Sequence, residues 1–108
     1  MERVSFEDFR KLDLRIAEVL EAKEHENADK LYVLQIDVGG EKKQIIAGVR
    51  GYYQAHELVG RKIIVVNNLE PVTLRGEESN GMLLAAGTED GPVLLMPEKN
   101  VPSGSQIS

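Results

Sequence analysis

The sequence predicts an all-β fold, a small closed or partly closed barrel of five short strands with short flanking helices. Three observations support this prediction. Apolar residues alternate or are β-branched in several short runs, glycine-rich or proline-containing turns separate these runs, and little of the chain is suited to helix. A length of 108 residues is typical of one domain, so we expect residues 1–108 to share a single core.

The amino-terminal part holds one short helix and one ambiguous segment. Ser5 is a suitable N-cap for a helix that continues to Leu12, with acidic residues in its first turn. The segment 12–23 fits two structures, because its apolar positions have helical spacing and some of them also fit a strand face interrupted by Glu18. The pattern alone favours a helix here.

A β-hairpin follows. Leu31–Val38 alternates apolar and polar residues in the manner of a half-buried strand, and Tyr32 lies on its apolar face, which predicts a core position. Gly39-Gly40 supplies the positive φ angles that a two-residue hairpin turn requires. The second strand is therefore expected at Lys42–Ala47.

The second half supplies the remaining strands. Residues 52–58 can form one or two helical turns, the β-branched run within 61–67 suits a strand buried on both sides, and 72–80 has too few apolar residues to be more than an exposed loop. Further strands are expected at 81–86 and 93–96, joined by a turn at 89–92, with a short edge strand in the irregular tail 97–108. The OB-fold is the commonest five-stranded barrel of this kind.

Charge is distributed unevenly. The chain has 13 Lys and Arg against 18 Asp and Glu, a net charge of −5. Residues 41–76 nevertheless carry six basic and three acidic residues, between two acidic ends. Such asymmetry can steer an anionic ligand to one face, although on charge alone a mixed solvated surface is the simpler explanation.

Composition excludes several classes of protein. There is no cysteine, so disulfides and thiolate metal sites are excluded, and His25 with Asp29 lacks a third metal ligand. No apolar run is long enough to span a bilayer and no signal peptide opens the chain, so we expect no membrane association and a place in the cytosol or nucleus. We predict no metal and no cofactor.

Catalytic motifs are absent as well. Ser79 lacks the G-x-S-x-G elbow of a hydrolase, and neither histidine lies in a motif that makes it a general base. Neither the phosphate-binding loop nor the dinucleotide fingerprint occurs. We therefore predict a binding domain with no catalytic residue.

Two groups of residues suit binding. The first is the polar turn 25–32, which presents short side chains and Lys30 at a barrel rim. The second comprises 67–69 and 74–82, where amide, guanidinium and hydroxyl groups can bond phosphate or ribose. OB-folds bind oligonucleotides on one face and its flanking loops, although few aromatic residues are available here for base stacking.

These segments resemble the tRNA-binding domain found at the carboxyl end of many methionyl-tRNA synthetases. The chain is similar too to the free-standing dimeric tRNA-binding proteins and to the first part of endothelial monocyte-activating polypeptide. The resemblance covers essentially the whole chain, in order. The matching blocks are Asp13–Ile16, His25–Gly39, Gly48–Arg50, Asn67–Pro71 and Leu74–Ala86.

The resemblance implies an OB-fold that binds tRNA by its shape, commonly as a homodimer joined through its terminal segments. It also implies a first barrel strand beginning at Asp13–Ile16, where the pattern favours a helix. By position, Arg75 would contact phosphate, Ser79 would donate to ribose or phosphate, and Met82 would make an apolar contact, support the loop or pack in the core. The full predicted tRNA-binding set is Asn27, Lys30, Arg50, Asn68, Arg75, Ser79 and Met82.

The resemblance therefore predicts a non-catalytic, structure-selective tRNA-binding module. It would assist aminoacylation by methionyl-tRNA synthetase, in cis or as a separate subunit, in the cytoplasm. Glu26 stands where the family generally has proline, and its charge beside the binding rim predicts weaker, more salt-sensitive binding. Two alternatives remain open: a peptide-binding, export-related chaperone built on the same barrel, and a pure dimerisation module.

Overall fold

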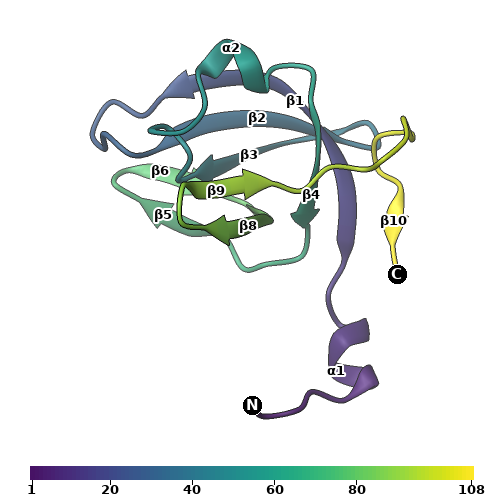
Figure 1. Ribbon diagram of the computed structural model, residues 1–108. Helices are drawn as coiled ribbons and strands as arrows, with labels where there is room; N and C mark the ends of the chain where they lie inside the picture. Colours follow the sequence, from purple (N-terminus) through teal and green to yellow (C-terminus); the bar gives the residue numbers. More distant parts are fainter.

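The computed structural model describes residues 1–108 as a curled sheet with two small hairpins (Figure 1). The main sheet has the strand order β3-β2-β1-β4-β7, and β10 pairs with the start of β1. The architecture confirms the predicted OB-fold barrel with short helices. The elements are α1 (Phe6–Arg10), β1 (Leu14–Glu24), β2 (Tyr32–Val38), β3 (Glu41–Ala47), α2 (Ala55–Leu58), β4 (Lys62–Val66), β5 (Val72–Leu74), β6 (Glu77–Ser79), β7 (Met82–Leu83), β8 (Ala85–Thr88), β9 (Gly91–Leu94) and β10 (Gln106–Ile107).

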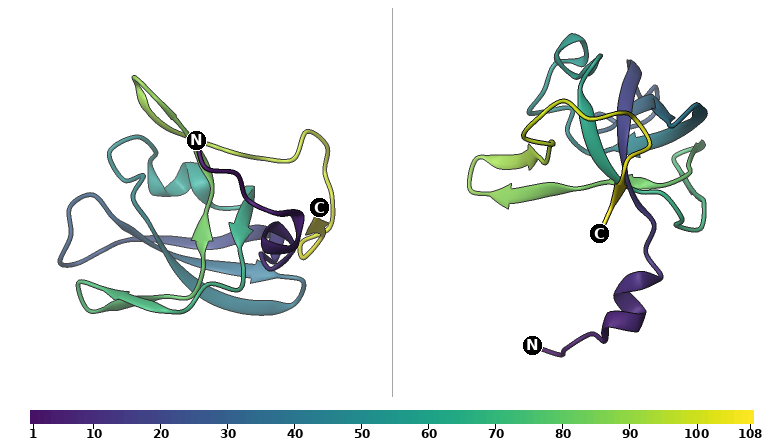
Figure 2. Two further views of the ribbon diagram at one scale, coloured as in Figure 1. Left: turned by 90° about the horizontal axis from the view of Figure 1, so that it is seen from below. Right: turned by 90° about the vertical axis from the view of Figure 1, so that its right-hand side faces the viewer.

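The predicted amino-terminal helix is present as α1. Ser5 caps it, because its Oγ accepts from the backbone N–H of Asp8 at 3.1 Å. The helix ends at Arg10 and lies apart from the barrel (Figures 1 and 2). Neither helix of the structure has the length and apolar character needed to cross a membrane.

The helix favoured by pattern within 12–23 is wrong, and the strand implied by the resemblance is confirmed. Strand β1 begins at Leu14 and pairs with both β2 and β4. Its register against β2 shifts between Val19 and Glu21, which marks a bulge at Leu20. A bulge interrupts the two-residue alternation, so the apolar positions along this strand resemble helical spacing.

The predicted hairpin is confirmed in β2 and β3. Gly39 and Gly40 have φ angles of 64° and 95°, the positive values that a two-residue hairpin turn needs. Tyr32 is buried as predicted, and its hydroxyl donates to the carbonyl of Tyr53 at 2.7 Å. The remaining alternate residues of β2 face the same core.

Strand β4 lies between β1 and β7 in the main sheet and is buried fully on only one side. Ile63 and Val65 are buried, whereas Ile64 and Val66 are half-buried. The prediction of burial on both sides is therefore wrong, since a barrel strand has one face inside and the other toward solvent or loops. The core consists of Ala17, Val19, Tyr32, Leu34, Ile36, Val38, Ile45, Ala47, Val49, Leu58, Ile63, Val65 and Leu94.

The segment predicted as an exposed loop, 72–80, is instead the hairpin β5–β6. Arg75 and Gly76 form its tip with φ angles of 53° and 92°. The strand predicted at 81–86 is divided into β7 and β8, and the one predicted at 93–96 begins earlier, at Gly91. The predicted edge strand in the tail is β10.

Candidate nucleic-acid interface

The loop between β1 and β2 is fixed to the β5–β6 hairpin by one buried histidine. His25 is only 3% exposed. Its Nδ1 accepts from the backbone N–H of Asn27 at 3.0 Å, so its Nε2 carries the proton and donates to the carbonyl of Leu74 at 2.9 Å. This side chain therefore joins two segments that lie 49 residues apart.

The histidine contact brings Lys30 and Arg75 to the same place. Both side chains line one depression of about 400 Å³, together with Ala28, Asp29 and Leu31. Both are exposed, and neither forms a hydrogen bond or ion pair through its charged group. Their donors are thus available to an anion. The polar turn 25–32 and the tip of the segment 74–82, which the sequence singles out separately, therefore meet here.

Asn27 and Arg50 belong to the same end of the barrel. Asn27 is exposed on the β1–β2 loop. Arg50 is half-buried beneath that loop, where its Nη1 donates to the carbonyls of His25 at 3.2 Å and Ala28 at 3.1 Å. Its Nη2 donates to Glu24 at 2.9 Å. Arg50 therefore stabilises the conformation of the β1–β2 loop through hydrogen bonds to its backbone.

Ser79 and Met82 lie on the segment that closes the barrel. The hydroxyl of Ser79 accepts from the N–H of Ile46 and donates to the carbonyl of Gly81, both at 2.9 Å. With Ser79 only 3% exposed, its hydrogen-bonding capacity serves the closure between β3 and β7. Met82 is 52% exposed, so it is not part of the core.

Asn68 lies in a separate polar cluster beside the amino-terminal end of β1. Its side chain accepts from the N–H of Asp13 at 2.8 Å and donates to the carbonyl of Lys11 at 2.6 Å. In the same cluster, hydrogen bonds from Asn67 and Arg15 lower the pKa of Asp13 below its ordinary value. These contacts fasten the chain before β1 to the barrel.

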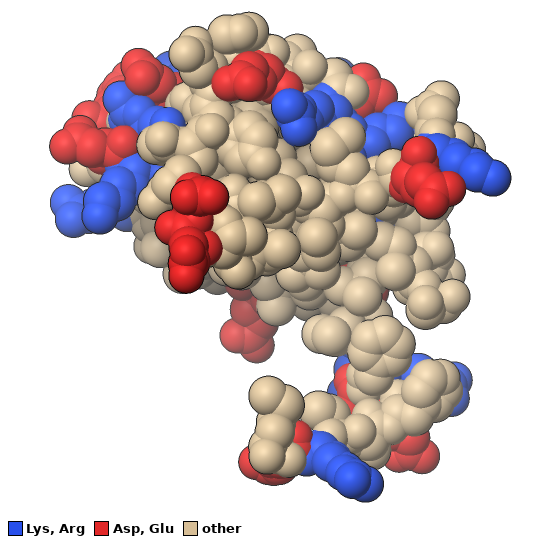
Figure 3. Space-filling view, viewed as in Figure 1, with Lys and Arg blue, Asp and Glu red and all other residues tan.

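The basic residues of the segment 41–76 do not gather in one group, since Arg75 lines one depression with Lys30 whereas Arg61 and Lys62 line another. Lys99 also lines the second of these depressions. In Figure 3, Lys and Arg gather accordingly at the left end of the barrel and again along its upper right. The sequence did not predict the hydrogen bond between His25 and the carbonyl of Leu74, although His25 begins the polar turn 25–32 that was predicted to bind.

A barrel with this strand order and with exposed cations on its loops is typical of OB-fold binding domains. The tRNA_bind family model, which describes a tRNA binding domain, matches residues 14–106. The chain therefore belongs to that family.

Methionine–tRNA ligases and several solved structures are similar to this chain in sequence. The methionine–tRNA ligase of Pyrococcus horikoshii is 50% identical over 107 residues, covering 99% of this chain but 15% of the ligase. Among solved structures, a MetRS-related protein from Pyrococcus horikoshii matches all of both chains with a TM-score of 0.93 and 35% identity. The chaperone CsaA of Bacillus anthracis matches 99% of this chain and 100% of its own with a TM-score of 0.90 and 34% identity. The chain thus spans a small part of its curated ligase relatives.

Proposed function

We propose that this chain is a non-catalytic, structure-selective tRNA-binding module that assists aminoacylation by methionyl-tRNA synthetase. The observation that carries the proposal is the meeting of Lys30 and Arg75 in one depression. Two cations placed side by side by the loops that carry them can contact phosphates of a folded RNA without reading its bases. Family membership and the ligase relatives support tRNA as the RNA.

The module would act by holding tRNA near a catalytic partner, in cis as a carboxyl-terminal domain or in trans as a separate subunit. A tethered binding site raises the effective concentration of its ligand without chemistry of its own. We place this activity in the cytoplasm, with the other steps of aminoacylation. The test is the rate of methionylation at limiting tRNA with and without the module, which should rise when the module is present.

Shape selectivity is tested by filter binding with tRNA, duplex RNA and single-stranded RNA at two salt concentrations. The proposal predicts preferential retention of tRNA, with affinity falling as salt rises because phosphate contacts release counterions. Equal retention of all three RNAs would contradict it. If Arg75→Ala lowers the affinity for different tRNA species equally, recognition of shape is supported. A loss of affinity confined to one tRNA species would contradict it.

A second copy of the chain is the partner we propose for the terminal segments. Phe6 and Phe9 of α1 are 71% and 42% exposed, and they line a depression of about 380 Å³ with Ile107 of β10. A five-residue helix has little stability unless its apolar side is covered. Sedimentation equilibrium should give a homodimer that Phe9→Asp converts to monomer. A monomeric parent chain would refute this partner.

Peptide binding is the second candidate function, favoured by the likeness to the chaperone CsaA. It requires an apolar surface for peptide in place of cations for phosphate. A fluorescent unfolded peptide should then bind with little dependence on salt, and Arg75→Ala should leave that binding unchanged. Failure of the peptide to bind, with tRNA retained, excludes this candidate.

A further inference from the structure

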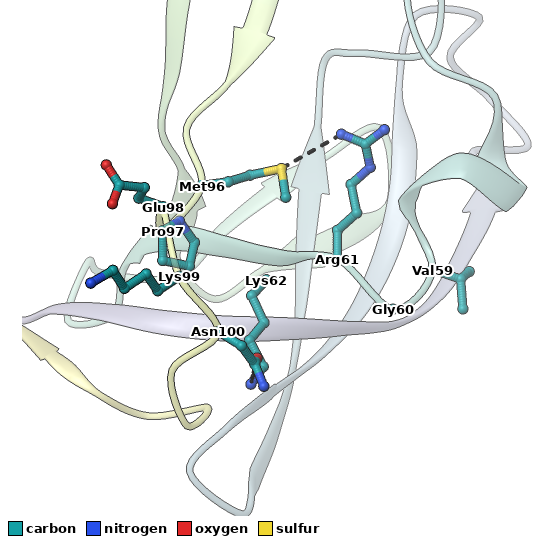
Figure 4. A pocket seen from close by; sticks show the side chains of 9 residues that line it. All are labelled: Val59, Gly60, Arg61, Lys62, Met96, Pro97, Glu98, Lys99 and Asn100. Atoms are coloured by element: carbon teal, nitrogen blue, oxygen red, sulfur yellow. Dashed lines mark hydrogen bonds between the residues drawn. The ribbon is translucent and has the colours of Figure 1, made fainter.

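A second group of cations lies where the turn before β4 faces the segment after β9. Between these segments is a depression of about 490 Å³ (Figure 4). Arg61 and Lys62 come from the β4 side, and Lys99 comes from the opposite wall. Glu98 is the one carboxylate in the lining. The local excess of cations is larger than at the Lys30–Arg75 depression, and the whole chain has a net charge of −5.

Arg61 is fixed in place by three neighbours. Its Nε donates to the carbonyl of Glu57 at 2.7 Å, and its Nη1 contacts the sulfur of Met96 at 3.6 Å. Its guanidinium carbon also lies 5.4 Å from the ring centre of Tyr53. These contacts use two of the five guanidinium N–H donors. The other three belong to a side chain already ordered, so binding an anion costs less conformational entropy.

The other two cations are spread along the depression. Lys62 donates to Asn100 at 2.8 Å and to the carbonyl of Val101, which holds the 96–101 segment beside β4. Lys99 is exposed and free of hydrogen bonds. In Figure 4 the side chains of Arg61, Lys62 and Lys99 point in different directions. Cations spread in this way suit successive phosphates of a polyanion better than one small anion.

We propose that this depression is a second contact for the phosphodiester backbone of RNA. The proposal rests on the proposed function, because the RNA is the tRNA held at the Lys30–Arg75 end. In a chain of net negative charge, local groups of cations are what attract RNA phosphates, and in Figure 3 Lys and Arg gather at the left end of the barrel and again along its upper right. Contact at both groups would also favour a folded RNA of fixed shape over a flexible strand.

Lys99→Gln tests the proposal with little risk to the fold, because the side chain is exposed and unbonded. Its matched control is Lys42→Gln, whose side chain is also exposed and unbonded but lies on β3, outside both depressions. Filter binding of tRNA at several salt concentrations should show Lys99→Gln weaker by about two- to fivefold, with the salt slope shallower by about 0.7 to 0.9 for one lost phosphate contact. Lys42→Gln should match the parent chain.

Arg61→Lys supplies a second measurement, since it keeps the charge but removes the fixed fork. It should also weaken tRNA binding, compared at equal folded fraction, and its Tm is recorded alongside. In the parent chain, the Nε–H resonance of Arg61 should shift on adding tRNA and not on adding equimolar inorganic phosphate.

Equal affinities for Lys99→Gln and Lys42→Gln would overturn the second contact while leaving the proposed function intact, provided that the parent chain still prefers tRNA. A shift of the Arg61 resonance with inorganic phosphate and not with tRNA would overturn it too. A parent chain with no preference for tRNA would instead refute the proposed function itself.

Discussion

Replacing Ser79 with alanine tests whether its hydroxyl serves the barrel or the tRNA contact that the resemblance implies. The hydroxyl bonds the N–H of Ile46 and the carbonyl of Gly81, each at 2.9 Å, in a site only 3% exposed. Each lost bond leaves a backbone group without this partner and costs about 1 to 1.5 kcal/mol, so the free energy of unfolding should fall by about 2 to 3 kcal/mol. For a domain of this size the Tm should fall by roughly 8 to 24 °C.

The assay pairs thermal unfolding with tRNA binding at a temperature where each variant is folded. Thr73→Ala is the matched control, because it removes an exposed hydroxyl from the adjacent strand of the same hairpin. Ser79→Ala should lower the free energy of unfolding but leave the affinity for tRNA within about twofold of the parent chain. A twofold change is small, because a loss of about 1.4 kcal/mol in binding free energy would lower the affinity tenfold. An unchanged Tm with a large loss of affinity would show instead that the Ser79 hydroxyl contacts tRNA and does not support the barrel.

Three further variants test the fold and the interface. Hydrogen bonds lower the pKa of Asp13 in the folded state, so the ionised side chain stabilises the fold above the unfolded pKa of about 3.9, and this stabilisation is lost as the pH falls through the folded pKa. The urea midpoint of Asp13→Asn should therefore vary less with acid pH than that of the parent chain. Equal pH dependence of the two midpoints would contradict this. A Cβ on Gly104 would lie 2.5 Å from the Cα of Gly39, so Gly104→Ala should cost about 1 to 3 kcal/mol in urea unfolding, whereas Gly87→Ala, with open space around it, should cost little. His25→Ala should weaken tRNA binding less than additively with Arg75→Ala in a double-mutant cycle, and strict additivity would show that the histidine does not position the arginine.

The pattern of apolar and turn residues predicted those strands and turns whose structure depends only on neighbouring residues. The β2–β3 hairpin follows from a clean alternation and from Gly39-Gly40, which few other residue pairs could replace at two positive φ angles. Strand β1 could not be recognised in this way, because the bulge at Leu20 displaces its alternation. The β5–β6 hairpin was missed because Arg75, a residue that rarely adopts positive φ, occupies its tip.

The candidate interface was predictable in its residues but not in its arrangement. Residue chemistry placed Lys30 and Arg75 in two groups that suit binding, and the resemblance then gave both a role in tRNA binding, which stays a prediction. Their meeting depends on the hydrogen bond from His25 to Leu74, across 49 residues of sequence, for which local periodicity carries no signal. Arg50 and Ser79 read equally well as surface contacts in the sequence, whereas the structure shows how their hydrogen bonds support the loop and the barrel closure.

The central claim is that the end of the barrel joined by His25 is where tRNA binds. Its most direct test is the affinity for tRNA, relative to duplex RNA of equal length, in the parent chain, Arg75→Ala and the exposed control Lys42→Ala. We expect a preference for tRNA that Arg75→Ala greatly reduces and Lys42→Ala preserves. A preference that survives Arg75→Ala, or that both variants reduce equally, would contradict the claim.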